Sequence, residues 1–230
     1  MSRDYKKSAL LVIILIFAFM ISGCTFIFQK GRRSDVEKID ELSKQLDELN
    51  AAKNLLSERL KQEIADKEVR LEMAEKGLVI TFVADVLFDS GKAKLRTESL
   101  PTLDKVARVL SENLSEYNIG IEGHTDNEPI KYSGWKSNWE LSSSRALSVL
   151  HYMTDEKGIS GYRVCAIGYG EYHPVAANDT KEDMKLNRRV EIVVLPKVAK
   201  VKGRQKEAKK EIQETAASEE ELKEPVENLK

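Results

Sequence analysis

The stretch from Ser34 to Lys76 constrains the fold most, because it contains neither proline nor glycine. Its composition of Leu, Glu, Lys, Asp and Ala is typical of helices. Apolar residues at steps of four and three form a seam, interrupted by Lys53: Ile39, Leu42, Leu46, Leu49, Leu56, Leu60 and Ile64. The sequence therefore predicts a helical stalk over residues 34–76 that ends at Gly77. The seam leaves two readings open, a self-associating coiled coil that makes a homodimer or a solvated single-helix spacer.

A globular core has to come from residues 78–196, where strand-like and helix-like segments alternate. Strand patterns begin at 78, 117, 163 and 188, and the third holds Cys165, which predicts a buried and inert thiol. Helical patterns cover 97–114 and 137–157, and Ser137 with Glu140 has the spacing of a capping box. The order β-α-β-α-β-β predicts an α/β fold, a two-layer sandwich of one sheet and two helices.

The N-terminus carries the signals of a secretory leader. Arg3, Lys6 and Lys7 precede an apolar run that ends in Ser22-Gly23-Cys24, and this ending resembles a bacterial lipobox. The resemblance implies a lipoprotein signal peptide over 1–23, lipidation of Cys24, a linker over 24–33 and sorting to the outer membrane. The alternative is an uncleaved anchor, because the apolar stretch over residues 8–28 is long enough to span a bilayer.

Charged residues are balanced over the whole chain but are concentrated near its C-terminal end. The 230 residues carry 37 Lys and Arg against 38 Asp and Glu, so the net charge of −1 gives no pull toward nucleic acid. Residues 197–230 are rich in lysine and then in glutamate. Such a segment has too few apolar residues for a core and predicts a disordered tail.

Five motifs in the globular part resemble the OmpA-like C-terminal domain, the family of OmpA, MotB and Pal. They are FDSGKAKL at 88–95, GHTDN at 123–127, NWELSSSRA at 138–146, GYGEYHPVAAND at 168–179 and NRRVEI at 187–192. The resemblance covers about residues 78–196. It implies a domain that is not an enzyme, needs no cofactor, and binds peptidoglycan non-covalently through the diaminopimelate of the stem peptide.

The resemblance also assigns a binding site. Asp126 is expected to hold the ammonium of diaminopimelate and Arg145 its carboxylate, because a guanidinium can donate two parallel hydrogen bonds. The remaining residues assigned to the pocket are Asn138, Leu141, Thr125, Phe88, Asp89, Ser90, Gly91 and, as a supporting charge, Arg188. A lysine-type stem peptide lacks the second carboxylate, so meso-diaminopimelate walls are the expected partner.

Three alternatives compete with parts of this assignment. Glu122, His124 and Asp126 lie two residues apart and could ligate a metal with His173, but the expected cation at Arg145 disfavours it, so no metal is predicted. Trp135 and Trp139 could stack on sugar or pack a loop onto the helix that follows.

The third alternative concerns the whole protein, an inner-membrane wall anchor similar to MotB with an uncleaved helix. The insertion NEPIKYSGWKS resembles MotB-like members of the family. However, residues 8–28 contain no Asp or Glu that could carry an ion across a membrane. The sequence therefore favours a lipid-anchored protein on the periplasmic side of the outer membrane and argues against ion conduction.

Overall fold

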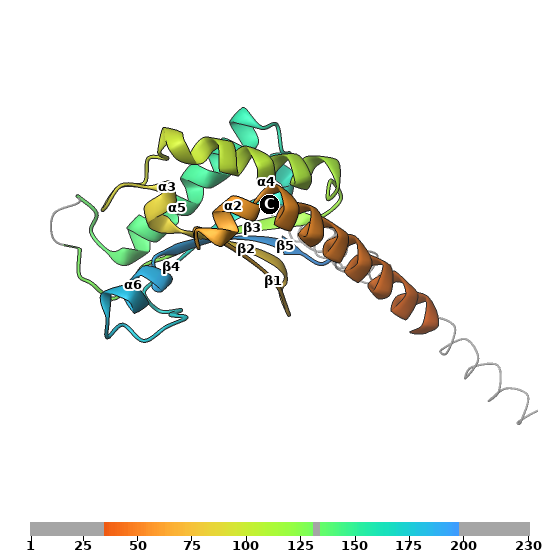
Figure 1. Cartoon of the computed structure of the whole chain (residues 1–230), viewed down its shortest axis with the longest axis horizontal. Coiled ribbons are helices and arrows are strands. Elements are labelled where there is room, and N and C mark those ends of the chain that lie inside the picture. The colour runs from red at the N-terminus through yellow and green to blue at the C-terminus, as the bar shows by residue number, and fades with distance from the viewer. Residues whose placement is uncertain (1–34, 131–133, 198–230) are drawn as a thin grey trace, which may run out of the picture. The chain divides into compact units, whose positions relative to one another are not determined.

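The computed structural model describes residues 35–130 and 134–197, in which helices pack on one mixed sheet (Figure 1). The strands are β1 (Val69–Ala74), β2 (Gly77–Val83), β3 (Asn118–His124), β4 (Val164–Gly170) and β5 (Arg189–Leu195). The helices are residues 35–59, α2 (Lys61–Ala65), α3 (Ala84–Leu87), α4 (Leu100–Glu112), α5 (Asn138–His151) and α6 (Lys181–Asn187). Within these described ranges, no helix combines the length and apolarity that a membrane span requires.

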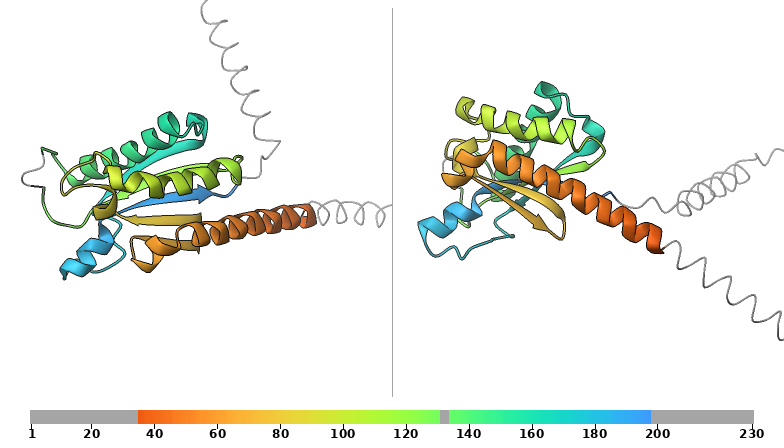
Figure 2. Two further views of the ribbon diagram at one scale, coloured as in Figure 1. Left: turned by 45° about the horizontal axis from the view of Figure 1, so that its top comes forward. Right: turned by 45° about the vertical axis from the view of Figure 1, so that its right-hand side comes forward.

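The sheet has the strand order β1-β2-β5-β3-β4. β3 and β4 run parallel, whereas the other neighbouring strands are antiparallel. Ile80, Ile192 and Ile121 lie opposite one another on β2, β5 and β3, so branched apolar side chains cross the middle of one face. Helices α4 and α5 cover this face (Figure 2). The predicted α/β sandwich of two layers is therefore confirmed.

The strand β1 corrects the prediction of a helix through Lys76. The helical segment ends at Ala65, Lys67 adopts a left-handed φ of 60°, and residues 69–74 pair with β2 across a tight turn. Val69, Leu71 and Met73 face inward while their neighbours are exposed, so the apolar residues beyond the seam follow a strand period of two. The backbone pairing offered by β2 outweighs the helical preference of Leu, Glu and Met. Gly77 begins β2 and does not end a helix.

The boundary between stalk and head also needs correction. Leu49, Leu56 and Leu60 are buried in the same core as the sheet, and the Tyr117 hydroxyl, next to β3, donates to Glu48 Oε2 at 2.7 Å. Earlier in the same helix, Ile39, Leu42 and Leu46 are exposed. The seam therefore has two parts. Its later part packs onto the head, and its earlier part presents apolar side chains to solvent.

Two glycines let α5 lie directly against the sheet. A Cβ on Gly123 of β3 would overlap the backbone carbonyl of Ser142, and a Cβ on Gly168 of β4 would overlap Ser143. Ser142 itself is fully buried and its hydroxyl accepts a hydrogen bond from the Gly170 amide at 3.0 Å. The close contact fixes the height of α5 above the sheet, and with it the position of the side chains that α5 carries.

Candidate functional site

A cavity of about 890 Å³ opens beside the end of β3. All the side chains assigned from the sequence line it: Asp126, Arg145, Asn138, Thr125, Leu141, Phe88, Asp89, Ser90, Gly91 and Arg188. Five further lining residues were not assigned from the sequence: Asp85, Arg96, Glu128, Pro129 and Ile130. The chain segments that meet here are far apart in sequence.

The end of β3 presents Thr125 and Asp126 to the cavity. The Thr125 amide donates to the carbonyl of Gly170 at 2.9 Å, which continues the parallel pairing with β4 for one more residue. Asn138, the first residue of α5, donates from Nδ2 to the carbonyls of Asp126 at 3.4 Å and Glu128 at 3.1 Å. These bonds hold the loop after β3 against the start of α5.

Asp126 is only 5% exposed, and it is paired with Arg188. Arg188 Nη1 donates to Asp126 Oδ2 at 2.7 Å, while Nη2 of the same guanidinium lies 3.2 Å from Asp85 Oδ2. The sequence assigned Arg188 only a supporting charge. The structure instead makes it the direct partner of Asp126, bridged to a second carboxylate that the sequence analysis missed. Asp85 follows β2 and belongs to none of the five motifs, so only the tertiary structure identifies it as part of the site.

Arg145 is 3% exposed, and no carboxylate of the described residues lies within 4.0 Å of its guanidinium. Its Nε donates to the carbonyl of Lys92 at 2.9 Å, and the guanidinium carbon lies 5.2 Å from the centre of the Phe88 ring. Burial lowers the pKa of Arg145 to about 10, opposed by the negative charges of Asp85 and Asp126 and helped by the positive charge of Arg188, so the group remains a cation at neutral pH. A buried cation without a carboxylate partner favours an anionic ligand.

The two tryptophans occupy different surroundings. Trp135 Nε1 donates to the carbonyl of Gly91 at 2.8 Å, which ties the loop before α5 to the cavity wall and fits the packing role. Trp139 is stacked on Tyr172 with ring centres 4.9 Å apart, and both rings are partly exposed. Neither tryptophan lines the cavity.

The residues of the metal alternative do not meet as the sequence suggested. Asp126 lies in the cavity, whereas Glu122 and His124 lie on the opposite face of the sheet, because Gly123 between them faces α5. His124 stacks on Tyr169, and its ring centre lies 6.5 Å from that of His173. Cys165 likewise departs from expectation. It is exposed on β4, at the sheet edge, where its side chain points away from the core.

The fold and the cavity together define a class, a two-layer α/β binding domain that holds an acidic side chain and an arginine in one recess. Residues 87–188 match the OmpA family, and this match contains the assigned site residues. Residues 87–188 therefore form a domain of the OmpA family. Asp85 lies just before the matched range.

Two relatives illustrate the range of this similarity. Motility protein B of Bacillus subtilis is 39% identical over 153 residues, which cover 66% of this chain and 58% of that protein. Outer membrane porin F of Pseudomonas aeruginosa is 37% identical over 116 residues, which cover 50% of this chain and 32% of that protein. The chain thus spans less than two thirds of the length of either relative.

Solved structures show the same fold. The cell wall anchor of the T6SS from Pseudomonas aeruginosa is 35% identical with a TM-score of 0.56, and the match covers 62% of this chain and 97% of that one. A putative MotB like protein from Desulfovibrio vulgaris is 26% identical with a TM-score of 0.61, over 69% and 98% of the two chains.

Proposed function

We propose that the cavity binds peptidoglycan and that the protein anchors a membrane to the cell wall without catalysing a reaction. The observation that supports this proposal most directly is that a cationic and an anionic side chain lie in one cavity. A buried arginine without a carboxylate partner and a carboxylate lie in the same cavity. The solved relative named as a cell wall anchor supports the same role.

The proposed ligand is the side-chain terminus of meso-diaminopimelate, where an ammonium and a carboxylate share one carbon. Arg145 takes the carboxylate, which supplies the charge partner that the guanidinium lacks among the described residues. Asp126 takes the ammonium through Oδ1, because Oδ2 already accepts from Arg188 while Oδ1 has only a long 3.3 Å bond from the Glu128 amide. Thr125 offers a buried hydroxyl that has no hydrogen-bond partner among the described residues.

The anchor is the second part of the proposal. Lipidation at Cys24 in the outer membrane follows from the lipobox-like ending, whereas the match to Motility protein B favours the alternative of an uncleaved inner-membrane helix. Residues 1–34 lie outside the described part of the chain. Mass spectrometry of the mature N-terminus distinguishes the two, because a lipidated Cys24 and an intact Met1 differ in mass and in sequence.

Co-sedimentation with purified sacculi tests the binding site. Asp126→Asn and Arg145→Gln should each weaken binding by about 10- to 100-fold, because each removes a charge-assisted hydrogen bond worth about 1.5–3 kcal/mol. Asp179→Asn and Arg108→Gln are matched controls, since both residues are exposed and lie outside the cavity. Circular dichroism and thermal melting check that every variant folds.

Two results would contradict the proposal. One is wild-type binding by correctly folded variants at both cavity positions. The other is equal binding to diaminopimelate-type and lysine-type sacculi, because the lysine-type stem leaves Arg145 desolvated without an anion.

A further inference from the structure

A second group of ionisable side chains lies on the sheet face that points away from α4 and α5. Glu122 of β3 sits directly opposite Glu191 of β5, and His124 follows two residues later on the same strand. One ligand atom from each of the three side chains lies within 4.8 Å of the others. All three residues are buried. This cluster shares no residue with the cavity proposed to bind peptidoglycan.

His124 is the member of this cluster whose side chain lacks hydrogen-bond partners. The residue is 3% exposed, and neither ring nitrogen has a hydrogen-bond partner in the described part of the chain. A buried polar atom without a partner destabilises the folded state, because it has lost its hydrogen bonds to water. Burial, with the nearby charge of Arg189, lowers the pKa of His124 to about 3, so at neutral pH the imidazole is uncharged and has a lone pair to donate.

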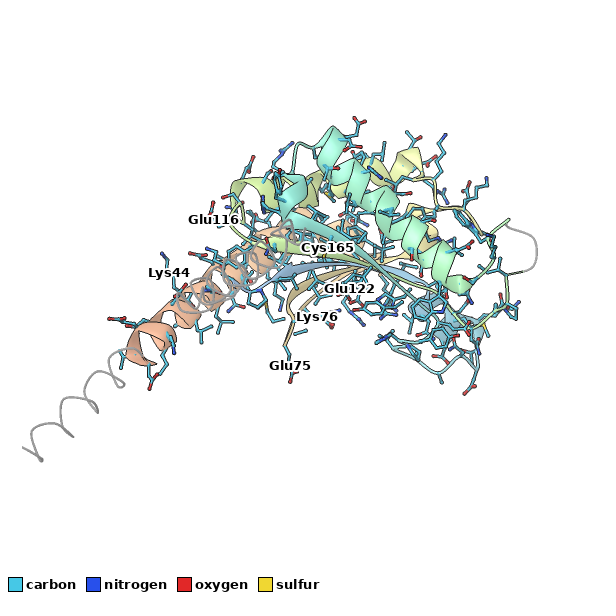
Figure 3. The ribbon with its side chains drawn as sticks, turned by 180° about the vertical axis from the view of Figure 1, so that it is seen from behind. Lys44, Glu75, Lys76, Glu116, Glu122 and Cys165 are labelled. Atoms are coloured by element: carbon cyan, nitrogen blue, oxygen red, sulfur yellow. The ribbon has the colours of Figure 1, made fainter. Side chains whose placement is uncertain are left out.

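A cation already lies between the two carboxylates. Lys76 Nζ is 2.6 Å from Glu122 Oε2 and 2.6 Å from Glu191 Oε2. Lys76 comes from the turn between β1 and β2, and its side chain reaches along the sheet face to this point (Figure 3). That side chain is 40% exposed, so the ammonium can move into solvent. The ammonium of Lys76 donates to the two carboxylates, whereas neither ring nitrogen of His124 receives a hydrogen bond from it.

We propose that Glu122, His124 and Glu191 form a binding site for a divalent transition metal of the Zn²⁺ type, which displaces the ammonium of Lys76. One imidazole nitrogen with two carboxylate oxygens is a donor set suited to zinc, and water completes a tetrahedral shell. Ligand atoms around tetrahedral zinc lie about 3.3 Å apart, so the three side chains have to close by up to about 1.5 Å. Side-chain rotation supplies this movement.

The charges around the site accommodate the exchange. Arg189 Nε donates to Glu191 Oε1 at 2.6 Å. Before a metal binds, the negative charges of the two glutamates are therefore balanced by Lys76 and Arg189. Replacing the Lys76 ammonium by a divalent ion leaves a single positive charge, and the released ammonium stays protonated in solvent. Because the ligands come from β3 and β5, the bound metal would join the two central strands and add to the stability of the fold.

Zinc binding to the untagged full-length chain tests this site. After treatment with chelator and its removal, equilibrium dialysis should show about one Zn²⁺ per chain, with a concentration-dependent rise in melting temperature. The chain has three histidines, so single variants assign the imidazole ligand. His124→Phe preserves the stack on Tyr169 and should weaken binding more than about 10-fold, whereas His151→Phe and His173→Phe should not.

Two more variants examine the carboxylate and the displaced lysine. Glu122→Gln should weaken zinc binding as His124→Phe does, and Lys76→Gln should strengthen it because the competing ammonium is gone. The site is refuted if no zinc binds, if His124→Phe retains wild-type affinity, or if Lys76→Gln leaves the affinity unchanged or weaker. Sacculus binding is measured separately, so failure here does not bear on the peptidoglycan proposal.

Discussion

At the scale of single residues, Arg188 links the site to the stability of the fold. It bridges Asp126 and Asp85, and the Asp126 side chain is almost fully shielded from solvent. Removing one partner of a buried ion pair leaves the other charge without compensation, which costs several kcal/mol, although the partly exposed side chain of Arg188 reduces this figure. Asp126, which is proposed to bind the ligand, therefore also relies on Arg188 to compensate its buried charge.

We expect Arg188→Gln to lower the free energy of unfolding by about 1–3 kcal/mol. Adding Asp126→Asn should recover part of this loss, because the uncompensated carboxylate is then gone. Urea unfolding of the two single variants and the double variant measures the coupling. Strictly additive losses would show that the 2.7 Å contact contributes nothing to stability.

His124 makes stability depend on pH in the metal-free protein. Its pKa is lowered from 6.5 to about 3 in the folded chain, mainly by burial. The unfolded chain therefore takes up the proton first, so stability is full above about pH 6.5 and falls as the pH decreases toward 3. Burial opposes the lowering of the Glu191 pKa, but bonds from Lys76 and Arg189 bring it to about 2, so Glu191 contributes only below about pH 4.5.

Between pH 6.5 and 4.5, His124 contributes to the pH dependence of stability whereas Glu191 does not. There we expect the free energy of unfolding to fall by about 1.4 kcal/mol per pH unit. In His124→Phe this slope should largely disappear, whereas His173→Phe should keep it. Urea unfolding in the presence of chelator at several pH values measures the slope, and an identical slope in both variants would contradict the assignment.

At the scale of elements, the site depends on how closely α5 approaches the sheet. Arg145 and Asn138 both sit on α5, and the helix can take this position only because β3 and β4 present glycines beneath it. The same glycines occur in the GHTDN and GYGE motifs. The motifs therefore include residues required for packing as well as residues assigned to binding.

We expect Gly123→Ala and Gly168→Ala each to destabilise the fold by about 1–3 kcal/mol, because the new methyl group meets helix backbone that has no space to move. Both should also weaken sacculus binding, since a displaced α5 moves Arg145. Gly161→Ala is the matched control, because its Cβ would meet nothing within 4 Å and its φ is not left-handed. Melting temperatures and co-sedimentation provide the two readouts, and unchanged values for both sheet glycines would contradict this account.

At the scale of the whole molecule, the helix over residues 35–59 connects the head to the segment that precedes it. Its buried part belongs to the head, while Val36, Ile39, Leu42 and Leu46 expose an apolar stripe. The stripe has the spacing of a coiled-coil seam and suits a second copy of the chain. Two heads on one dimer would bind a repetitive wall polymer more tightly than one, by about 10²–10⁴-fold when both engage.

We expect Leu42→Glu to shift the full-length chain from dimer to monomer, because it places a charge in the seam. Ser43→Glu adds the same charge at an exposed position outside the seam and should leave the dimer intact. Sedimentation velocity gives the oligomeric state, and co-sedimentation should show weaker wall binding for Leu42→Glu alone. A monomeric wild-type chain would exclude the coiled-coil reading in favour of the single-helix spacer.

The sequence determined the local elements that depend on short-range patterns. Ser137 caps α5 as its spacing with Glu140 indicated, and its hydroxyl accepts from the Glu140 amide at 3.3 Å. The alternation of apolar residues in β3 and β5 was sufficient to predict the sandwich. The resemblance carried by the five motifs assigned part of the cavity lining, but it missed five residues, Asp85 among them. Such signals lie within a few residues of one another, so they can be read from the chain alone.

The tertiary structure decided the features that arise where distant segments meet. It turned residues 69–74 into a strand because β2 offered a pairing partner, and it made Arg188 the direct ion-pair partner of Asp126. It also brought Glu191 opposite Glu122, although the two residues are 69 positions apart in the chain. Long-range pairing of backbone and charge depends on the whole fold, and a local sequence pattern does not encode it.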